Sequence, residues 1–301
     1  MKSVDFSVII PQKNSIDSLP RLFATIPEWD NIEIIVADNN DTPVTKEEIG
    51  INREYTLCWS SPKRFAGGAR NEGMKHAHGK WLIFSDADDI FKDDAFETFE
   101  SKKESEADVV YFGMDGLFIE TGERSDAGDI YSNMVKRYLA NSENDIDIRI
   151  SFHTPCSKMV RREYVERNGF QYDEVRANND DYFAMLVGYN AAKIEAVDKV
   201  VYTYIATHGS LMHRRSYDVI KARYEVILRK NRYLRKHGLR NKQGSVAFFL
   251  SQSPHYGIKA MLEFFAMLIK YGQNPFVGAS NWGKTIKKTK ESHNNDYISK
   301  K

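Results

Sequence analysis

Short apolar runs alternate with helical patterns over the first third of the chain. The runs are FSVIIP, NIEIIVAD, YTLCWSS, KWLIFSD and ADVVYFGM, and between them SLPRLFATIP, GGARNEGMKHAHG and DDAFETFESKKES have the spacing of amphipathic helices. Continuous apolar runs rich in β-branched residues are typical of strands that are buried on both faces. The pattern therefore predicts an α/β sheet with helices on both sides.

The pattern weakens from about residue 114 to 150, where we expect a hairpin and a helix at the edge of the sheet. NNDDYFAMLVGYNAA then predicts a helix, and KIEAVDKVVYTYIA predicts two paired strands. Two long helices follow, YDVIKARYEVILRKNRYLRKHG and VAFFLSQSPHYGIKAMLEFFAMLIKYG. The prediction is a catalytic domain over 1–212, with halves at about 1–113 and 114–212, a helical extension over 213–283, and a basic, disordered tail over 284–301.

Composition narrows the class of protein. The chain has 301 residues, of which 42% are hydrophobic, and its 43 basic and 42 acidic side chains give a formal charge of +1. This balance gives no reason to expect a nucleic-acid partner. Cys58 and Cys156 are the two cysteines, so the sequence offers neither a disulfide framework nor a zinc site. With no run of about 18 apolar residues, we expect a cytoplasmic protein.

Three carboxylates end the apolar run of GKWLIFSDADDIF. Ligands of open α/β sheets bind beyond the carboxyl ends of the strands, where Asp86, Asp88 and Asp89 are placed. A hard divalent cation such as Mg²⁺ or Mn²⁺ is held by one or two protein carboxylates together with waters and phosphate oxygens. Asp86 and Asp88 would share one side of an extended chain. Taken alone, a surface turn with an aspartate capping the next helix explains the cluster equally well.

Five blocks in a fixed order carry more information than this cluster. SVIIPQKN, EIIVADNNDT, AGGARNEGMKHAHGKWLIFSDADD, GFQYDE and NNDDYF together resemble the family-2 glycosyltransferases of the GT-A fold, over about residues 5–212. The resemblance implies that Pro11 and Asn14 end the first strand beside the nucleotide. It also implies a block for the base and ribose, here Asp38, Asn39, Asn40 and Asp41. Asn39 replaces an aspartate that commonly pairs with uracil, so the base stays open.

The remaining blocks suggest further donor contacts. ARNEG matches the start of a family helix and implies that Arg70 and Asn71 lie near the nucleotide-sugar, although an ordinary surface position for Arg70 is an equal alternative. In the DADD block, the resemblance places Asp86 on the ribose side and makes Asp88 the ligand of Mn²⁺ or Mg²⁺. Asp89 becomes a group that supports them. The metal would neutralise the departing diphosphate.

The catalytic base of the family lies in an E-D-x-x-F block at the start of a helix. NNDDYF makes Asp180 the counterpart of that base, with Asp181 as the rival after a slip of one residue. Asn179 then departs from the family's glutamate. Both carboxylates could instead be favourable charges at a helix N-terminus. In TPCSKMVRREYV, we favour a surface position for Lys158 over a contact with the donor phosphate.

The apolar residues Met261, Phe264, Phe265, Met267 and Leu268 have the spacing of one packing face, for which a core or a subunit contact is the first interpretation. The lysines near this face and in the tail leave open a peripheral contact with the inner face of the cytoplasmic membrane. A homodimer also stays open.

The resemblance therefore implies an inverting, metal-dependent glycosyltransferase. It would move one sugar from a nucleoside-diphosphate sugar to a hydroxyl of a glycan or lipid-linked acceptor, in capsule, lipopolysaccharide or exopolysaccharide synthesis. The Q-x-x-R-W block and the transmembrane helices of the family's processive synthases are absent from the sequence. Two alternatives stay open: a nucleotidyltransferase, which would normally show a glycine- and arginine-rich phosphate loop, and a catalytically eroded nucleotide-sugar-binding protein, which Asn39 and Asn179 would fit.

Overall fold

A computed structural model describes residues 4–206 and 216–279. Among these residues, one unit holds 4–174 and 179–206, and a second unit holds 175–178 and 216–279. The predicted boundary at 212/213 and the predicted tail over 284–301 lie outside the described residues. The division of the chain into the predicted domains therefore stays a prediction.

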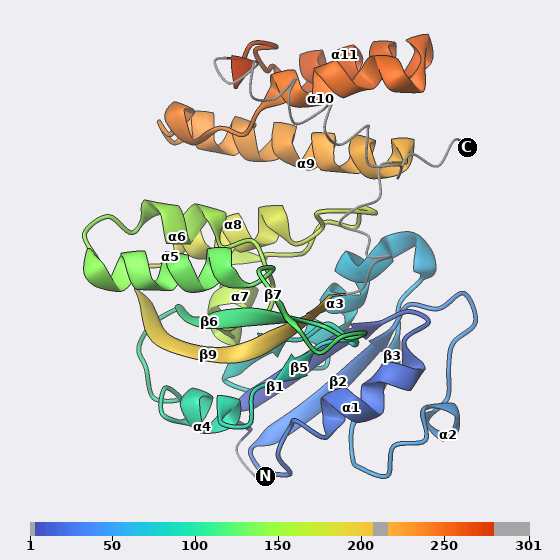
Figure 1. Ribbon diagram of the computed structural model, residues 1–301, viewed down its shortest axis with the longest axis vertical. Coiled ribbons are helices and arrows are strands. Elements are labelled where there is room, and N and C mark those ends of the chain that lie inside the picture. Colours follow the sequence, from blue (N-terminus) through green and yellow to red (C-terminus); the bar gives the residue numbers. More distant parts are fainter. Residues whose placement is uncertain (1–3, 207–215, 280–301) are drawn as a thin grey trace. The chain divides into compact units, whose positions relative to one another are not determined.

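A nine-stranded mixed sheet forms the centre of the first unit (Figure 1). The strand order is β3-β2-β1-β4-β8-β6-β9-β5, with β7 paired to β6. The strands are β1 (Phe6–Gln12), β2 (Ile32–Asp38), β3 (Thr56–Trp59), β4 (Trp81–Phe84), β5 (Ile90–Phe91), β6 (Val109–Phe118), β7 (Arg124–Ser125), β8 (Lys158–Arg161) and β9 (Ile194–Ala206). Strands β1 to β4 are mutually parallel, and the antiparallel β8 separates β4 from β6.

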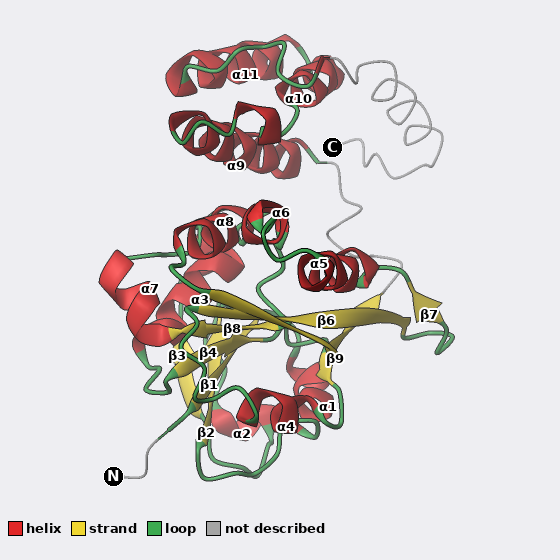
Figure 2. Ribbon diagram, turned by 90° about the vertical axis from the view of Figure 1, so that its left-hand side faces the viewer, coloured by secondary structure: helices red, strands yellow, loops and turns green. Residues whose placement is uncertain are grey.

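Helices cover both faces of this sheet, as the sequence pattern predicts (Figure 2). Alternate residues of β1 serve two different cores: Phe6, Val8 and Ile10 pack on the face of α1 and α4, and Ile9 packs on the face of α3, α7 and α8. This alternation is the two-residue period of a strand. The helices of the unit are α1 (Leu19–Phe23), α2 (Lys46–Ile49), α3 (Phe65–Lys75), α4 (Ala95–Glu100), α5 (Asp129–Ala140), α6 (Ile146–Ser151), α7 (Arg162–Asn168) and α8 (Asp181–Asn190).

The parallel strands bring distant polar residues to one edge of the sheet. Gln12 at the end of β1 lies opposite Asp38 at the end of β2, and Asp38 lies opposite Trp59 at the end of β3. On the other side of β1, Ile9 pairs with Phe84, the last residue of β4. The chain segments that follow β1, β2 and β4 therefore leave the sheet at the same edge, which is where the ligands of such sheets bind.

The prediction of two paired strands over 193–206 is wrong. These residues form the single long strand β9, which runs parallel to β6 and pairs with β5 near its end. The register slips between Phe112 and Gly113, so that Val197 and Val200 of β9 face successive residues of β6. Asp198 and Lys199 are therefore bulged residues. Their polarity suggested a turn because a bulge and a turn interrupt an apolar strand pattern in the same way.

The second unit is helical, with α9 (Tyr217–Lys236), α10 (Val246–Gln252) and α11 (Ile258–Tyr271). Its core is built around Tyr224 and Phe264, whose rings stack with centroids 4.7 Å apart. The single long helix predicted over 246–272 is wrong, because a 3₁₀ turn at Ser253–Tyr256 and Gly257, with a φ of 90°, separate α10 from α11. None of the described helices combines the length and the apolar composition needed to cross a bilayer.

Candidate active site at the carboxyl ends of the strands

The loop after β2 is organised by a buried carboxylate. Asp38 accepts hydrogen bonds from Nε2 of Gln12 (2.6 Å), from the backbone N and Nδ2 of Asn40 (3.1 and 2.8 Å), and from the backbone N of Val44 (2.9 Å). Its side chain is 1% exposed. A buried carboxylate is stable only when its oxygens are paired in this way. Asp38 therefore fixes the shape of the loop that the sequence assigns to the base and ribose.

Asn39 shows why this loop departs from the family pattern. Its Nδ2 donates to the carbonyl oxygens of Ser60 (3.1 Å) and Ser61 (2.8 Å), and the residue is buried. An aspartate here would set a carboxylate against two carbonyl acceptors. The amide therefore joins the loop after β2 to the segment after β3, a role that a carboxylate would fill poorly.

A surface hollow of about 590 Å³ lies beside this loop. Asn14 reaches it in a left-handed conformation, with a φ of 55°, and its backbone N donates to Oδ1 of Asn40 at 3.0 Å. Pro11 is buried within β1, three residues earlier. The lining residues of the hollow are Asn14, Ile16, Asp17, Asn40, Asp41, Thr42, Val44 and Glu48. The volume is in the range of small-ligand sites, and Asn14, Asn40 and Asp41 come from the two predicted nucleotide blocks.

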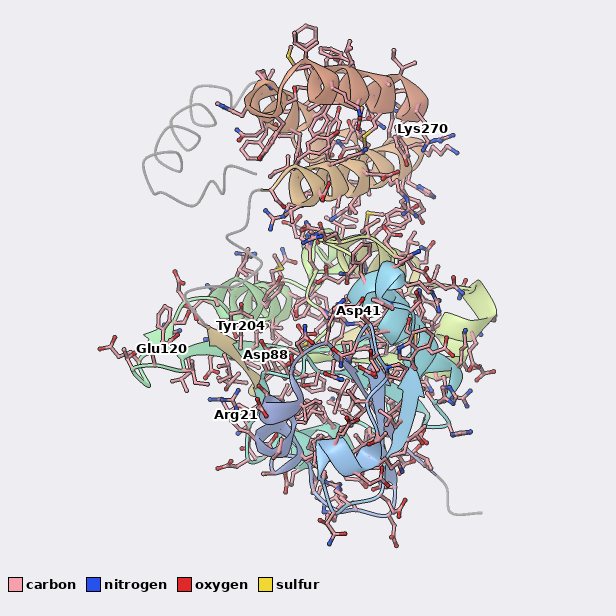
Figure 3. All side chains as sticks on the ribbon, turned by 90° about the vertical axis from the view of Figure 1, so that its right-hand side faces the viewer. Arg21, Asp41, Asp88, Glu120, Tyr204 and Lys270 are labelled. Atoms are coloured by element: carbon pink, nitrogen blue, oxygen red, sulfur yellow. The ribbon has the colours of Figure 1, made fainter. Side chains whose placement is uncertain are left out.

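The carboxylates after β4 lie in a turn and not in an extended chain. The backbone N of Asp89 donates to the carbonyl of Asp86 at 3.2 Å, so the expectation that Asp86 and Asp88 share one side of an extended segment is wrong. Arg21 of α1 donates to the carbonyl of Asp88 at 2.5 Å, and this hydrogen bond stabilises the turn (Figure 3). Asp88 itself is exposed, and its carboxylate accepts no hydrogen bond from another described residue.

Asp89 belongs to a buried network below the turn. Its Oδ2 accepts from the Tyr202 hydroxyl at 2.8 Å and its Oδ1 from the backbone N of Ile205 at 2.7 Å. The same hydroxyl accepts from the backbone N of Asp86 at 2.9 Å. Burial, together with the nearby charges of Asp86 and Asp88, raises the pKa of Asp89 well above its usual value. Asp89 thus ties the turn to β9.

The donor set decides which of these groups suits a metal ion. Among the described residues, ligand atoms of Asp86, Asp89 and Cys156 lie within 4.8 Å of one another. Both oxygens of Asp89 are already bonded, and burial raises the pKa of the Cys156 thiol well above its usual value. A protonated thiol is a poor ligand for a hard cation, which prefers oxygen. The carboxylates that fit such a cation are therefore Asp86 and the exposed Asp88.

Arg70 connects the two carboxylate segments of the site. It is 5% exposed, so the surface alternative for this residue is wrong. One guanidinium nitrogen donates to Oδ1 of Asp86 at 2.5 Å and the other donates to Oδ1 of Asn179 at 2.8 Å. Burial disfavours its charge, but electrostatic interactions with Asp86, Tyr172 and Asp180 together outweigh burial, so the pKa of Arg70 is raised. The guanidinium also lies 5.3 Å from the centre of the Tyr172 ring.

The start of α3 is fastened to the segment before Asn179. The Asn71 amide donates to the carbonyl of Tyr172 at 3.0 Å and accepts from its backbone N at 2.8 Å, as a neighbouring strand would. The helix also comes so close that a Cβ on Gly67 would lie 1.9 Å from the carbonyl oxygen of Asp173. Asn71 thus contacts protein backbone, and its predicted contact with the nucleotide-sugar stays a prediction.

Asp180 and Asp181 differ in the hydrogen bonds that their carboxylates make. Asp181, 7% exposed, is hydrogen-bonded to Nδ1 of His153. Asp180 is the residue before the first turn of α8, and its carboxylate accepts no hydrogen bond from another described residue. Burial and the charge of Asp181 raise the pKa of Asp180, while Arg70 and His153 oppose the rise. Of the two rivals, Asp180 is thus the carboxylate that is left available.

Lys158 is not on the surface, contrary to the sequence-based interpretation. It is 3% exposed, its Nζ donates to the carbonyl of Phe152 at 2.9 Å, and it lies 5.8 Å from the centre of the Tyr111 ring. Burial lowers its pKa to about 7, against the opposing charge of Asp180. The sequence pattern did not predict this burial, because a lysine in a four-residue strand such as KMVR resembles an exposed edge residue.

Sequence reasoning also missed Arg21, His153 and Tyr202, each of which bonds one of the predicted carboxylate segments. Tyr202 lies in the apolar strand pattern of β9, where a tyrosine is expected to pack in the hydrophobic core. His153 and Arg21 are single polar residues without a motif. Only the folded chain shows which carboxylate each of them contacts.

Comparisons with known proteins agree on one family. The family model for glycosyl transferase family 2 matches residues 7–169, more than half of the 301-residue chain. A glycosyltransferase of Streptococcus pneumoniae, GlyG, is 26% identical over 237 residues, which cover 72% of this chain and 75% of that protein. The poly(ribitol-phosphate) beta-N-acetylglucosaminyltransferase TarS of Staphylococcus aureus is 25% identical over 209 residues, which cover 66% of this chain but only 35% of TarS.

Solved structures show the same fold. The crystal structure of S. aureus TarS 1–349 matches with a TM-score of 0.62 at 20% identity, over 89% of this chain and 79% of that one. A mannosyltransferase of Pyrobaculum calidifontis in complex with GDP-Man and Mn²⁺ matches with a TM-score of 0.53 at 13% identity, over 98% of this chain and 83% of that one. With the mixed sheet described above, these matches confirm the predicted GT-A fold.

Proposed function

Because the chain belongs to glycosyl transferase family 2 and is a glycosyltransferase, we propose that it transfers one sugar, with inversion, from a nucleoside-diphosphate sugar to an acceptor hydroxyl. One observation carries the proposal. The buried guanidinium of Arg70 bonds Asp86 and Asn179, and so holds the carboxylate turn after β4 beside the segment that leads into Asp180. The proposed metal ligand Asp86 and the proposed base Asp180 are 94 positions apart in sequence, and the bonds of Arg70 support their assignment to one site.

The donor side is the edge formed by β1, β2 and β4. The hollow beside Asn14, Asn40 and Asp41 would take the nucleoside, with its loop held rigid by Asp38 and Asn39. Asp86 and Asp88 would hold Mn²⁺ or Mg²⁺, which supplies positive charge to the leaving diphosphate. The mannosyltransferase that shares the fold was crystallised with a nucleotide-sugar and Mn²⁺, which supports this assignment. TarS was crystallised with UDP-GlcNAc.

The base would be Asp180. An inverting transfer needs one carboxylate that accepts the proton of the attacking hydroxyl. Burial and the charge of Asp181 raise the pKa of Asp180, and the positive charge of Arg70 opposes this rise and so favours the ionised form that a base requires. Asp181 bonds His153 and fixes the start of α8, so its proposed part is to orient the base. Lys158, buried near Asp180, would add positive charge when protonated.

The acceptor would be a glycan or a lipid-linked intermediate of a surface polysaccharide. The similarity to TarS, a poly(ribitol-phosphate) beta-N-acetylglucosaminyltransferase, supports a role in this kind of pathway. We propose that the reaction occurs in the cytoplasm or at the inner face of the cytoplasmic membrane, where nucleotide-sugars are made.

Calorimetric titration with UDP, GDP, CMP and dTDP, each with and without Mn²⁺, tests the donor side. We expect one nucleotide to bind more tightly with metal, and Asp88→Ala to remove that dependence. Asp93→Ala is the matched control, because Asp93 is an exposed carboxylate that follows the same turn. Metal dependence that survives in Asp88→Ala, or is lost equally in Asp93→Ala, would exclude Asp88 as the ligand.

A further inference from the structure

Helix α11 carries four large apolar side chains that face away from its own core. Ile258, Leu262, Phe265 and Ile269 are 77%, 65%, 47% and 80% exposed. Their spacing of four, three and four residues places them in one line along the helix. We call these four residues the apolar stripe. The opposite side of α11 holds the buried Ala260, Phe264 and Leu268, so the sequence-based packing face was only partly right: Phe265 belongs to the stripe.

Basic side chains border this stripe. Lys259 and Lys270 are both exposed and are eleven residues apart, which is three helical turns, so they project from the same edge of α11 beside the stripe. Lys270 lies at the end of the helix (Figure 3), and its largely exposed side chain places Nζ 3.9 Å from Glu225 of α9. A long lysine side chain at this position can lie along an apolar surface with its ammonium group in a polar layer. The exposed side of the helix is therefore itself amphipathic, because the apolar stripe lies beside basic side chains.

The second unit as a whole is also positively charged, like the border of the apolar stripe. Residues 175–178 and 216–279 contain twelve basic and three acidic side chains, whereas residues 4–174 and 179–206 contain 22 basic and 37 acidic ones. The overall charge of +1 is therefore small although the sheet unit is acidic and the helical unit is strongly basic. Such an asymmetry favours an anionic partner for the helical unit.

We propose that α11 is an interfacial helix that lies on an anionic lipid bilayer, with the apolar stripe inserted at the level of the acyl chains and Lys259 and Lys270 among the headgroups. Apolar insertion and attraction to anionic lipid add up in this arrangement. A nucleic-acid partner would use the basic charge but would leave the stripe in water. A second copy of the chain would cover the stripe but would bring two basic units together.

The test is flotation of the full chain with phosphatidylcholine vesicles, with and without phosphatidylglycerol. We expect binding that increases with phosphatidylglycerol and weakens with salt. Leu262→Ser together with Ile269→Ser should weaken the partition coefficient at least about tenfold, because apolar area would no longer be buried. Lys259→Gln together with Lys270→Gln should weaken only the phosphatidylglycerol-dependent part, by roughly fivefold to twentyfold.

The matched control is Ile130→Ser together with Leu139→Ser. These side chains are 56% and 47% exposed on α5 of the sheet unit, and their replacement should leave the partition coefficient unchanged. Thermal unfolding of each variant shows that it is folded, and nucleotide titration reports separately on the sheet unit. The proposal is overturned if the wild type ignores both kinds of vesicle, or if the stripe variant floats like the wild type. It is also overturned if the stripe variant only turns a dimer into a monomer in sedimentation, or if the basic unit prefers duplex nucleic acid to vesicles.

Discussion

Two strand ends in this protein carry aspartates that look alike in sequence and differ in the fold. Asp38, the last residue of β2, is 1% exposed and accepts four hydrogen bonds from its neighbours. Asp88 after β4 is exposed, and its carboxylate accepts none from another described residue. The difference comes from nearby donors: Gln12 and Asn40 surround Asp38, whereas Asp88 has two carboxylates beside it. A strand-end aspartate thus stabilises the fold when donors surround it, and is available to a ligand when like charges do.

The largest expected effect on activity is at Asp180, whose carboxylate, like that of Asp88, accepts no hydrogen bond from another described residue. Asp180→Asn should lower kcat by about 10²- to 10⁴-fold or more, because general-base assistance is lost, with the donor Kd nearly unchanged. Single-turnover kinetics and nucleotide titration measure the two quantities. Asp181→Asn is the control and should cost less in kcat. If Asp181→Asn is the more damaging of the two, the assignment must be exchanged.

The next effect contrasts the two strand ends directly. Asp38→Ala should lower the free energy of unfolding by about 2–4 kcal/mol, because it leaves several buried donors without an acceptor. Asp88→Ala should change it by less than about 0.5 kcal/mol, since an exposed carboxylate beside like charges is lost. Urea denaturation of the two variants gives the comparison. If the two variants are equally destabilised, the turn after β4 depends on Asp88 as much as the loop after β2 depends on Asp38.

A smaller effect is expected at Asn39. Asn39→Asp should destabilise the protein by about 1–3 kcal/mol, because a carboxylate would face the carbonyls of Ser60 and Ser61. The burial should raise the pKa of the new carboxyl group, so the loss should be smallest at acidic pH and should grow as the pH rises. Denaturation curves at several pH values show the trend. A flat dependence on pH would show that the loop rearranges around the substitution.

The smallest expected effect is a shift in the pH profile. Since burial and Asp181 raise the pKa of Asp180 above its ordinary value of 3.8, kcat/KM should fall on the acid side as the pH drops through this raised pKa. His153 opposes the rise and pairs with Asp181. His153→Gln should therefore move the acid limb to higher pH by roughly 0.5–1 unit. A limb that moves to lower pH would contradict this electrostatic arrangement.

The order of elements was readable from the sequence because strands buried on both faces give long apolar runs. The bulge in β9 and the break before α11 were not, since Asp198, Lys199 and Pro254 have the same local signature as turns or as tolerated helix residues. The blocks that resemble the family located the carboxylate segments. Their division into bonded and available groups depends on Arg70, Tyr202 and His153, whose partners are distant in sequence and are brought to them only by the tertiary fold.

The link between Asp89 and β9 has a consequence for biosynthesis. The carboxylate turn after β4 is fixed by Tyr202 and by the backbone of Ile205, more than 110 residues further along the chain. A ribosome that has made the chain through this turn has therefore produced Asp89 without the residues of β9 that bond it. Contacts of such long sequence separation form slowly. Until β9 emerges and pairs with β5 and β6, Asp89 lacks both of its hydrogen-bond partners, and the sheet is completed only in the last part of its synthesis.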